Sequence, residues 1–528
     1  MATLAQSFSS DGARVALIVP QNPALSITYQ QLHSEISKFQ AKLASLGVGH
    51  GAAVNLALVN SYEFIVGFLA ASWQRAIAAP LNPAYKQDEF EFYIDDLSST
   101  LVLIPRGSYA QDGPAVRAGR KYQAAIAECY WNGTEVVLDV KELGKLEGKG
   151  NAGIQKAQPD DVALVLHTSG TTGRPKAVPL THKNLTTTMS MLIQPRSTLS
   201  RANPATGNIQ ATYKLTPEDR TYLVMPLFHV HGLLAAFLAP LASGGSVIVP
   251  TKFSASEFWS DFIKYKANWY SAVPTIHQIL LKSPQPNPIP PIRFIRSCSS
   301  PLSPKTFQDL EKTFNAPVLE AYAMTEAAHQ MTSNPLPPAK RQPGSVGIGQ
   351  GVEIKILDQA GNEVPQGAEA EICVRGENVT KGYLNNPAAN KSSFTKGGFF
   401  RTGDQGKKDS DGYVIITGRI KELINKGGEK ISPIELDNTL LSNPKVGEAV
   451  CFAIPDEGHY GEDIGAAVVL KSGQSATETE LKAWVEGKLA KFKTPKQVWI
   501  VSQIPKTATG KIQRRKVAET MLKPKAKL

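Results

Sequence analysis

Short apolar runs alternate with amphipathic segments along the first 420 residues of the chain. The run at residues 53–59 precedes a helical pattern at 63–73, and the run at 162–166 precedes another helical pattern after His182. A short apolar run suits a buried strand, whereas apolar positions three and four residues apart suit a helix that covers it. The alternation predicts an α/β fold whose large N-terminal domain consists of layered sheets and helices.

The last hundred or so residues show a pattern of their own. We expect helices at 433–441 and 478–489, and strands at 414–416, 450–454 and 466–470. Two or three strands with two helices predict a small α+β domain. We therefore divide the chain into an N-terminal domain, 1–419, and a C-terminal domain, 420–528.

Composition agrees with a multi-domain globular protein. The chain has 528 residues, of which 42% are hydrophobic and 20% charged, which excludes a disordered chain and a small disulfide scaffold. The four cysteines include no Cys-x-x-Cys pair, so they predict buried thiols in a reducing compartment and not a zinc site. Segments 107–119 and 196–207, rich in Gly, Pro, Ser, Arg and Asn, predict surface loops.

The sequence does not predict a membrane span or a secretory signal. The longest apolar stretch, 232–250, is interrupted by Pro240 and by serine and glycine residues, so it lacks about 20 uninterrupted apolar residues. The N-terminal residues have neither a basic region nor a long apolar run. The final residues, Ala526, Lys527 and Leu528, resemble a peroxisomal targeting signal. We expect a peroxisomal import receptor as a partner and a peroxisomal location, with the cytoplasm as the alternative.

The excess of positive charge is concentrated near the C-terminus. The net charge is +11, and residues 491–528 hold eleven lysines and arginines with a single acid, Glu519. Such clustering suits polyphosphate ligands, an anionic membrane surface or RNA. Charge alone leaves these partners open.

The sharpest local motif is the phosphate loop at residues 168–176, Thr-Ser-Gly-Thr-Thr-Gly-Arg-Pro-Lys, directly after the strand expected at 163–167. Glycines and small hydroxyl residues bring backbone N–H groups close to an anion, and Lys176 adds a point charge. The spacing differs from a Walker A loop, because Gly170 and Gly173 are three residues apart.

This loop resembles the signature loop of the adenylate-forming superfamily, which includes acyl-CoA synthetases, aryl-CoA ligases and luciferases. Further motifs of that superfamily follow in order, at 226–232, 322–326, 401–404, 418–422 and 505–511. The resemblance implies that a carboxylate attacks the α-phosphate of ATP, giving an acyl-adenylate and pyrophosphate, and that a thiol then displaces AMP. It implies ATP, Mg²⁺ and coenzyme A as cofactors.

The resemblance also implies a role for each motif. The β- and γ-phosphates would be covered by Thr168, Ser169, Gly170, Thr171, Thr172, Gly173 and Lys176. The adenine slot would consist of Ser299, Ser300, Pro301 and Tyr322. Asp404 and Arg419 would hold the ribose. Thr325 would approach the α-phosphate, and Glu326 would ligate Mg²⁺, for which a hard oxygen donor is suitable.

The C-terminal domain would be mobile and would supply a catalytic lysine. By resemblance, Lys511 reaches into the active site during adenylation and acts there with Thr325 and His229. Rotation about the hinge at Lys421 would then withdraw Lys511. The same rotation would bring Lys426, Gly427 and Gly428 to the site, where glycines let the pantetheine chain of coenzyme A pass close to the backbone.

The acid is predicted from polar residues at the acyl-binding positions, namely His229, His231, Ser297 and His329. Buried donors penalise an alkyl chain but suit a second carboxylate. The pattern around residues 320–327 and the peroxisome-like end resemble oxalyl-CoA synthetases of fungi and plants, which implies oxalate as the acid. Alternatives are a medium- or long-chain fatty acyl-CoA synthetase, an aryl-CoA synthetase and, more remotely, an RNA- or membrane-binding protein.

Overall fold

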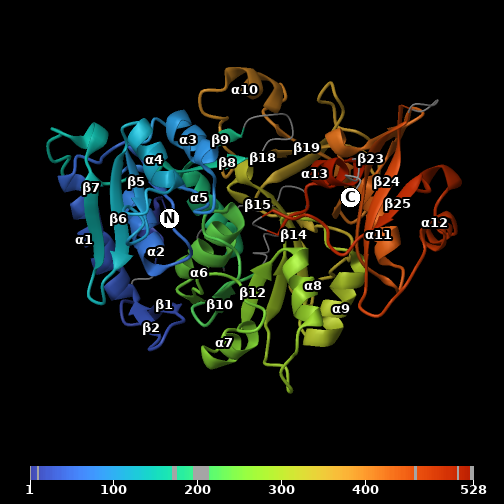
Figure 1. The fold of residues 1–528 in the computed structure, drawn as a ribbon, viewed down its shortest axis with the longest axis horizontal. Coiled ribbons are helices and arrows are strands. Elements are labelled where there is room, and N and C mark those ends of the chain that lie inside the picture. The colour runs from blue at the N-terminus through green and yellow to red at the C-terminus, as the bar shows by residue number, and fades with distance from the viewer. Residues whose placement is uncertain are drawn as a thin grey trace.

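The computed structural model describes residues 2–8, 11–168, 175–193, 213–456, 461–507 and 510–523. Two large sheets with their helices form most of the molecule, and a smaller C-terminal part lies beside them, at the right in Figure 1. The predicted α/β fold class, with a large N-terminal and a small C-terminal domain, is confirmed.

The first large sheet consists of β3 (Ala53–Leu56), β4 (Ile77–Pro80), β5 (Leu101–Ile104), β6 (Ala125–Trp131), β7 (Val136–Glu142), β8 (Val162–Thr168) and β9 (Lys176–Thr181). Its order is β7-β6-β5-β3-β4-β8-β9, with parallel inner strands and an antiparallel strand at each edge. β3 and β5 are buried along their whole length, which explains their continuous apolar sequence.

Five helices accompany this sheet: α1 (Tyr29–Ser45), α2 (Tyr62–Trp73), α3 (Gln87–Asp96), α4 (Pro114–Lys121) and α5 (His182–Leu192). α1 begins at Thr28, whose side chain forms a capping box with Gln31, and such a box satisfies two backbone donors at the helix start. Every residue of α2 except Glu63 is buried, because α2 packs against both the sheet and α1. The prediction of a loop over 107–119 is wrong for its second half, where α4 begins at Pro114. Proline is well tolerated in the first turn of a helix.

The second large sheet consists of β1 (Val15–Val19), β2 (Leu25–Thr28), β10 (Arg220–Leu223), β11 (Ser246–Ile248), β12 (Trp269–Ala272), β13 (Phe294–Ser297), β14 (Val318–Met324), β15 (His329–Ser333) and β16 (Ile348–Gly349). Its order is β16-β15-β14-β13-β12-β10-β11-β1-β2. The strands from β14 to β1 in this order run parallel to their neighbours. The helices α7 (Phe258–Lys264), α8 (Pro274–Lys282) and α9 (Pro304–Phe314) lie among these strands in the chain.

The long apolar stretch at 232–250 is divided among three buried elements: a π-helix, η3 (His231–Leu238), the short helix α6 (Ala239–Ala242) and β11. A Cβ atom at Gly232 would lie 2.3 Å from the carbonyl oxygen of Pro226, so only glycine allows the backbone to approach this closely. Within the described part of the chain, no helix combines the length and the apolar character that crossing a membrane requires.

A four-stranded antiparallel sheet connects the large sheets to the C-terminal part. It consists of β17 (Glu353–Leu357), β18 (Ala370–Arg375), β19 (Phe400–Lys408) and β20 (Val414–Arg419), and the helix α10 (Pro387–Ser393) precedes β19. β20 ends at Arg419, and the next sheet begins at Ile424. The domain boundary at 419/420 stays a prediction.

The C-terminal sheet consists of β21 (Ile424–Lys426), β22 (Glu429–Ile431), β23 (Val446–Asp456), β24 (Gly461–Leu470) and β25 (Gln497–Ile500). Its helices are α11 (Pro433–Leu441), α12 (Glu478–Glu486) and α13 (Arg514–Leu522). Sequence reasoning missed β21, β22 and α13, because β21 and β22 are only three residues long and α13 is strongly basic. A buried apolar cluster on Ile424, Leu436, Ile464 and Leu481 gives this part a core of its own.

The structure also shows the surroundings of the four cysteines and of the basic residues near the C-terminus. Cys129, Cys298, Cys373 and Cys451 are buried free thiols, as expected. Many basic residues near the C-terminus are paired with acids: Lys493 Nζ lies 2.7 Å from Glu435, Lys506 Nζ 2.8 Å from Glu448, and an Arg514 Nη 2.6 Å from Asp437. The loop expected at 196–207 lies outside the described residues.

Candidate active site

Several candidate site residues, some predicted and some not, lie where β12, β13 and β14 end. These strands are parallel neighbours, so their carboxyl ends lie at one edge of the sheet. Ser271 lies near the end of β12, Arg296 and Ser297 end β13, and Glu326 follows β14 in the 3-10 turn η4 (Thr325–Ala327). The carboxyl ends of parallel strands are where α/β folds bind ligands.

The predicted ribose site is assembled by β14, β19 and β20. Asp404 and Arg419 face each other in the antiparallel register, with Arg419 Nε 3.1 Å from Asp404 Oδ1. The hydroxyl of Tyr322 donates to Asp404 Oδ2. Burial raises the pKa of Asp404, and the charge of Arg419 opposes that shift. A buried carboxylate held in this way suits the predicted role as an acceptor for ribose hydroxyls.

The predicted adenine segment follows β13. Ser299 has a φ of +75°, a conformation that non-glycine residues rarely adopt, and the Ser300 hydroxyl donates to the Ser299 carbonyl at 2.9 Å. Pro301 is exposed. The N–H of the next residue, Leu302, donates to Glu320 Oε1 at 2.9 Å. Glu320 therefore fixes the segment to β14, two residues before Tyr322.

The phosphate loop connects β8 to β9. Ser169, Gly170, Thr171, Thr172 and Gly173 lie outside the described residues, whereas Thr168 and Lys176 face each other where the hairpin begins and ends. Lys176 Nζ lies 4.7 Å from the ring centre of Tyr383. The Tyr383 hydroxyl donates to Glu326 Oε1 at 2.8 Å, so one tyrosine connects the end of the loop to the predicted metal ligand.

The surroundings of Glu326 fit the predicted magnesium site. The side chain is buried, and burial raises the pKa of its carboxyl, while Tyr383, Arg419 and Lys176 favour the ionised form. Among the described residues, no group of three or more His, Cys, Asp or Glu could hold a metal ion by itself. The Glu326 carboxylate is a suitable ligand for Mg²⁺, which in phosphate-transfer sites is bound by one or two carboxylates together with the substrate's own phosphates. Thr325, half-buried, precedes Glu326.

The lysine loop of the C-terminal part reaches this edge of the large sheet. Lys511 Nζ lies 3.2 Å from His229 Nε2. The Thr275 hydroxyl, on α8, donates to the Gly510 carbonyl at 3.0 Å. Gly510 has a φ of +76° and packs near Val273 and Thr275. Burial lowers the pKa of Lys511 to about 8.

The backbone of His231 bears on the tautomer of His229. The N–H of His231 donates to His229 Nδ1 at 3.2 Å, so a neutral His229 carries its proton on Nε2. Burial and the charge of Lys511 keep the pKa of His229 well below its usual range. The Nε2 atom of a neutral His229 therefore faces the amine of Lys511.

Two further histidines occupy the predicted acyl side. The rings of His231 and His329 stack with centres 5.3 Å apart, and both residues are fully buried. Both nitrogens of His231 are engaged, Nδ1 with Ser299 at 3.0 Å and Nε2 with Ser271 at 2.6 Å. His329 has a φ of +91°, and its Nδ1 has no hydrogen-bond partner among the described residues. Buried orphan polar atoms are rare.

Arg296 lies behind these histidines and is fully buried. Its nitrogens donate to the Tyr213 hydroxyl, to Ser271 Oγ at 3.2 Å, to His329 Nε2 at 2.8 Å and to Gln330 Oε1 at 2.9 Å. All four acceptors are uncharged. Because arginine cannot accept, His329 Nε2 is the acceptor and Nδ1 carries the proton.

The structure separates some predicted residues from this cluster. The Ser297 hydroxyl is buried without a hydrogen-bond partner among the described residues, and strand alternation turns it to the face opposite Arg296. Lys421 lies in the 3-10 turn η5 (Ile420–Glu422). Lys426, at the end of β21, is paired with Asp463 at 2.7 Å. Gly427 and Gly428 form the turn to β22, with positive φ at both.

Sequence reasoning missed Arg296, Tyr383, Thr275 and Ser271. Arg296 carried a signal, a charged residue inside the apolar strand 292–296, which is unusual in a buried parallel strand. Tyr383 and Thr275 carried none, because their roles depend on contacts with residues far away in the sequence.

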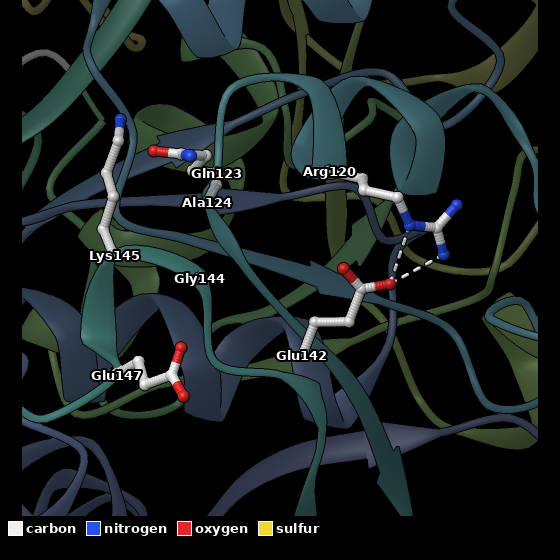
Figure 2. A pocket seen from close by; sticks show the side chains of 7 residues that line it. All are labelled: Arg120, Gln123, Ala124, Glu142, Gly144, Lys145 and Glu147. Carbon is white, nitrogen blue, oxygen red and sulfur yellow. Dashed lines mark hydrogen bonds and ion pairs between the residues drawn. The ribbon is translucent and has the colours of Figure 1, made fainter.

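A surface pocket elsewhere carries no comparable chemistry. Its volume is about 270 Å³, and Figure 2 shows the side chains that line it, among them Arg120, Gln123, Glu142 and Lys145. Arg120 is already paired with Glu142 at 2.6 Å and with Asp112 at 2.8 Å. None of the predicted site residues lines this pocket.

Comparison with known proteins agrees with the geometry. The sequence profile described as "AMP-binding enzyme" matches residues 4–384, and the profile of the "AMP-binding enzyme C-terminal domain" matches 435–511. An oxalate–CoA ligase of Saccharomyces cerevisiae is 48% identical, over 99% of this chain and 98% of its own length. An oxalate–CoA ligase of Arabidopsis thaliana is 47% identical, over 96% of this chain and 97% of its own length.

Among solved structures, MatB from Rhodopseudomonas palustris with bound ATP has a TM-score of 0.86, at 30% identity over 99% of both chains. The apo structure of the same protein gives a TM-score of 0.77. The chain is thus more similar to the ATP-bound structure of MatB than to its apo structure.

Proposed function

The chain belongs to the family of AMP-binding enzymes, and from this premise we propose that it ligates oxalate to coenzyme A. It is an ATP-dependent acid–CoA ligase, which forms an acyl-adenylate with release of pyrophosphate and then an acyl-CoA thioester with release of AMP. The proposal concerns the acid, the residues that recognise it and the movement between the two half-reactions.

The observation that supports oxalate as the acid is the unpartnered N–H of His329. It is a buried donor on the predicted acyl side, held by a buried arginine that has no carboxylate partner. An alkyl or aryl group would leave this donor unpaired, at a cost of about 1–3 kcal/mol, whereas a second carboxylate would accept a hydrogen bond from it. Full-length relatives from yeast and Arabidopsis are oxalate–CoA ligases, which supports the same acid.

In the first half-reaction, Lys511 would stabilise the charge that develops between the attacking carboxylate and the α-phosphate, with His229 beside it. Loss of one such preorganised contact costs about 10²–10³ in rate. Glu326 and the substrate phosphates would hold Mg²⁺, which supplies positive charge to the phosphates when bound. Asp404 and Arg419 would orient the ribose, and Tyr383 would fix Glu326.

For the second half-reaction, we infer that the C-terminal part rotates about Lys421. Lys426 pairs with Asp463 in the present arrangement, so the predicted role of Lys426, Gly427 and Gly428 at the pantetheine chain would require such a movement. Two glycines with positive φ leave that turn without side chains, as close passage of a ligand demands.

Acid preference tests the proposal directly. The protein is supplied with ATP, Mg²⁺, coenzyme A and, in turn, oxalate, malonate, acetate, octanoate and cinnamate, and pyrophosphate release and the mass of the thioester are measured. We expect the highest kcat/KM with oxalate. Greater activity with octanoate or cinnamate would favour the fatty acyl or aryl alternative.

Substitution of His329 tests whether this residue binds the second carboxylate of the acid. His329→Ala should lower kcat/KM for oxalate by about tenfold or more, because a hydrogen bond to a charged group is lost, and should leave the KM for ATP unchanged. The ratio of kcat/KM for propionate to kcat/KM for oxalate should rise. His50→Ala, in an exposed ion pair with Asp161, is the control. An unchanged oxalate-to-propionate ratio in His329→Ala would remove the histidine from the acid site.

We further propose that the protein is peroxisomal. The support is the sequence of Ala526, Lys527 and Leu528, which lie outside the described residues. Their deletion should leave catalysis intact and move a tagged protein to the cytosol; unchanged import would disprove the targeting role. RNA as a partner has weaker support, because many of the basic residues near the C-terminus are paired with acids.

A further inference from the structure

Arg296 differs from other arginines of the described chain in its burial and in its partners. The exposed Arg419 and the partly buried Arg514 and Arg293 each lie close to an aspartate, at 3.1, 2.6 and 3.0 Å. Arg296 is fully buried, and its hydrogen-bond partners among the described residues include no carboxylate; the Cys298 thiol also lies beside it. A guanidinium does not lose its proton in proteins, so the site contains a buried positive charge that no carboxylate of the described residues compensates.

Burying a charge without a counter-ion is costly, and such a charge is normally paired. Two hydrogen bonds of Arg296, to His329 and to Ser271, also indicate that this site binds an anion. Its Nη2 donates to His329 Nε2 at 2.8 Å, which leaves the proton on the buried, unpartnered Nδ1 of that ring. Its Nη1 donates to Ser271 Oγ, which also contacts His231. The arginine thus polarises His329 toward a negative ligand.

We propose that Arg296 determines the specificity of the enzyme for a dicarboxylate: it supplies the charge that the second, non-reacting carboxylate of the acid neutralises, and it holds His329 in the tautomer that donates to that carboxylate. The proposal rests on the proposed function, that the acid is oxalate. Arg296 acts through His329 and is therefore a positioning residue.

The chemistry of the cycle explains why a fixed arginine is suited to this task. Only one carboxylate of oxalate reacts with ATP, and the other stays ionised in the adenylate and in the thioester. Its partner must therefore keep a positive charge through both half-reactions. Lys511 would leave after the first, whereas Arg296 belongs to β13 of the large sheet and stays in place.

The test compares oxalate with oxamate, in which an uncharged amide replaces the second carboxylate at nearly the same size. Three variants are measured by pyrophosphate release. Arg296→Gln retains an amide donor for His329 but removes the charge. Arg296→Lys keeps the charge but loses the planar fork. Arg293→Gln, just before the same strand, is the matched control, because Arg293 is compensated by Asp219.

We expect the wild type to prefer oxalate to oxamate by at least about tenfold. Arg296→Gln should raise the KM for oxalate and lower its kcat/KM by about tenfold or more, while kcat/KM for oxamate changes by less than about threefold. Arg296→Lys should keep most of the oxalate preference, and Arg293→Gln all of it.

Equal losses on both acids in Arg296→Gln would assign the arginine a merely structural role and overturn the proposal. Equal kcat/KM for the two acids in the wild type would also overturn it, without recourse to any variant that folds poorly. A wild type that forms oxalyl-CoA but fails these comparisons refutes only this inference. A wild type that forms no oxalyl-CoA refutes the proposed function and this inference with it.

Discussion

Lys511 and His229 lie in close contact. His229 receives the N–H of His231 on Nδ1, so its Nε2 atom faces Lys511 Nζ at 3.2 Å. Burial is the main cause that lowers the pKa of Lys511 to about 8, with Arg419 acting in the same direction and Cys298 and Glu326 against it. Lys511 is therefore mainly charged at pH 7 and loses its charge as the pH rises through 8.

This predicts the pH dependence of adenylation. The charged form of Lys511 is the active one, and its pKa in the free enzyme is about 8, so kcat/KM should fall about tenfold per pH unit above pH 8. Pyrophosphate exchange without coenzyme A measures this step alone. Lys511→Arg, which stays charged, should show lower activity overall but no loss between pH 7 and pH 9. The same alkaline loss in Lys511→Arg would assign the ionisation to another group.

Motif residues are predictable from the sequence, but the residues that hold them in position through hydrogen bonds are not. Asp404, Arg419 and Glu326 lie at contacts suited to the roles that the motifs imply. Tyr383 is 57 residues from its partner Glu326, and Thr275 is 235 residues from Gly510. No local pattern encodes such pairs, because they form only when distant elements pack together.

At the scale of elements, the helices and strands with strong apolar periods were predictable. The helix expected at 433–441 matches α11, Pro433–Leu441, and the run at 162–166 lies within β8. The short hairpin β21–β22 and the π-helix η3 were not, because three-residue strands and an unusual helix type have no distinct period. The helix α4 was missed because the glycine and proline residues at 107–119 suggested a loop.

α8 holds the lysine loop in its reacting position, which makes a second prediction. Thr275→Val removes the hydrogen bond to the Gly510 carbonyl, worth about 1 kcal/mol, and should lower the rate of adenylation roughly fivefold. Thioester formation from supplied acyl-adenylate should not change. Thr275→Ser, which keeps the hydroxyl, is the control. Equal effects of Val and Ser on adenylation would show that the hydroxyl does not position the loop.

At the scale of the whole molecule, our proposal is that one sheet edge serves two half-reactions. The present arrangement places Lys511 beside His229 and Lys426 in an ion pair with Asp463. If the C-terminal part rotates about Lys421, the lysine and the glycine turn exchange places.

A proline at the hinge should separate the two half-reactions. Lys421 lies in a 3-10 turn, whose φ proline can adopt, so Lys421→Pro should permit the present arrangement and restrict the rotation. Adenylation should stay within about threefold of the wild type, while transfer to coenzyme A falls by roughly tenfold or more. Single-turnover measurements of each step provide the comparison. Unimpaired transfer would place the hinge elsewhere.

The central claim is that this protein activates oxalate as an adenylate, and oxygen labelling tests it most directly. The wild-type protein is given ATP, Mg²⁺, coenzyme A and oxalate labelled with ¹⁸O in its carboxylates, and the products are weighed by mass spectrometry. When an oxalate oxygen bonds to the α-phosphate and the thiol later breaks the bond from that oxygen to carbon, the oxygen stays on AMP. We predict oxalyl-CoA together with AMP that carries one ¹⁸O. Unlabelled AMP, or ADP in its place, would contradict the account.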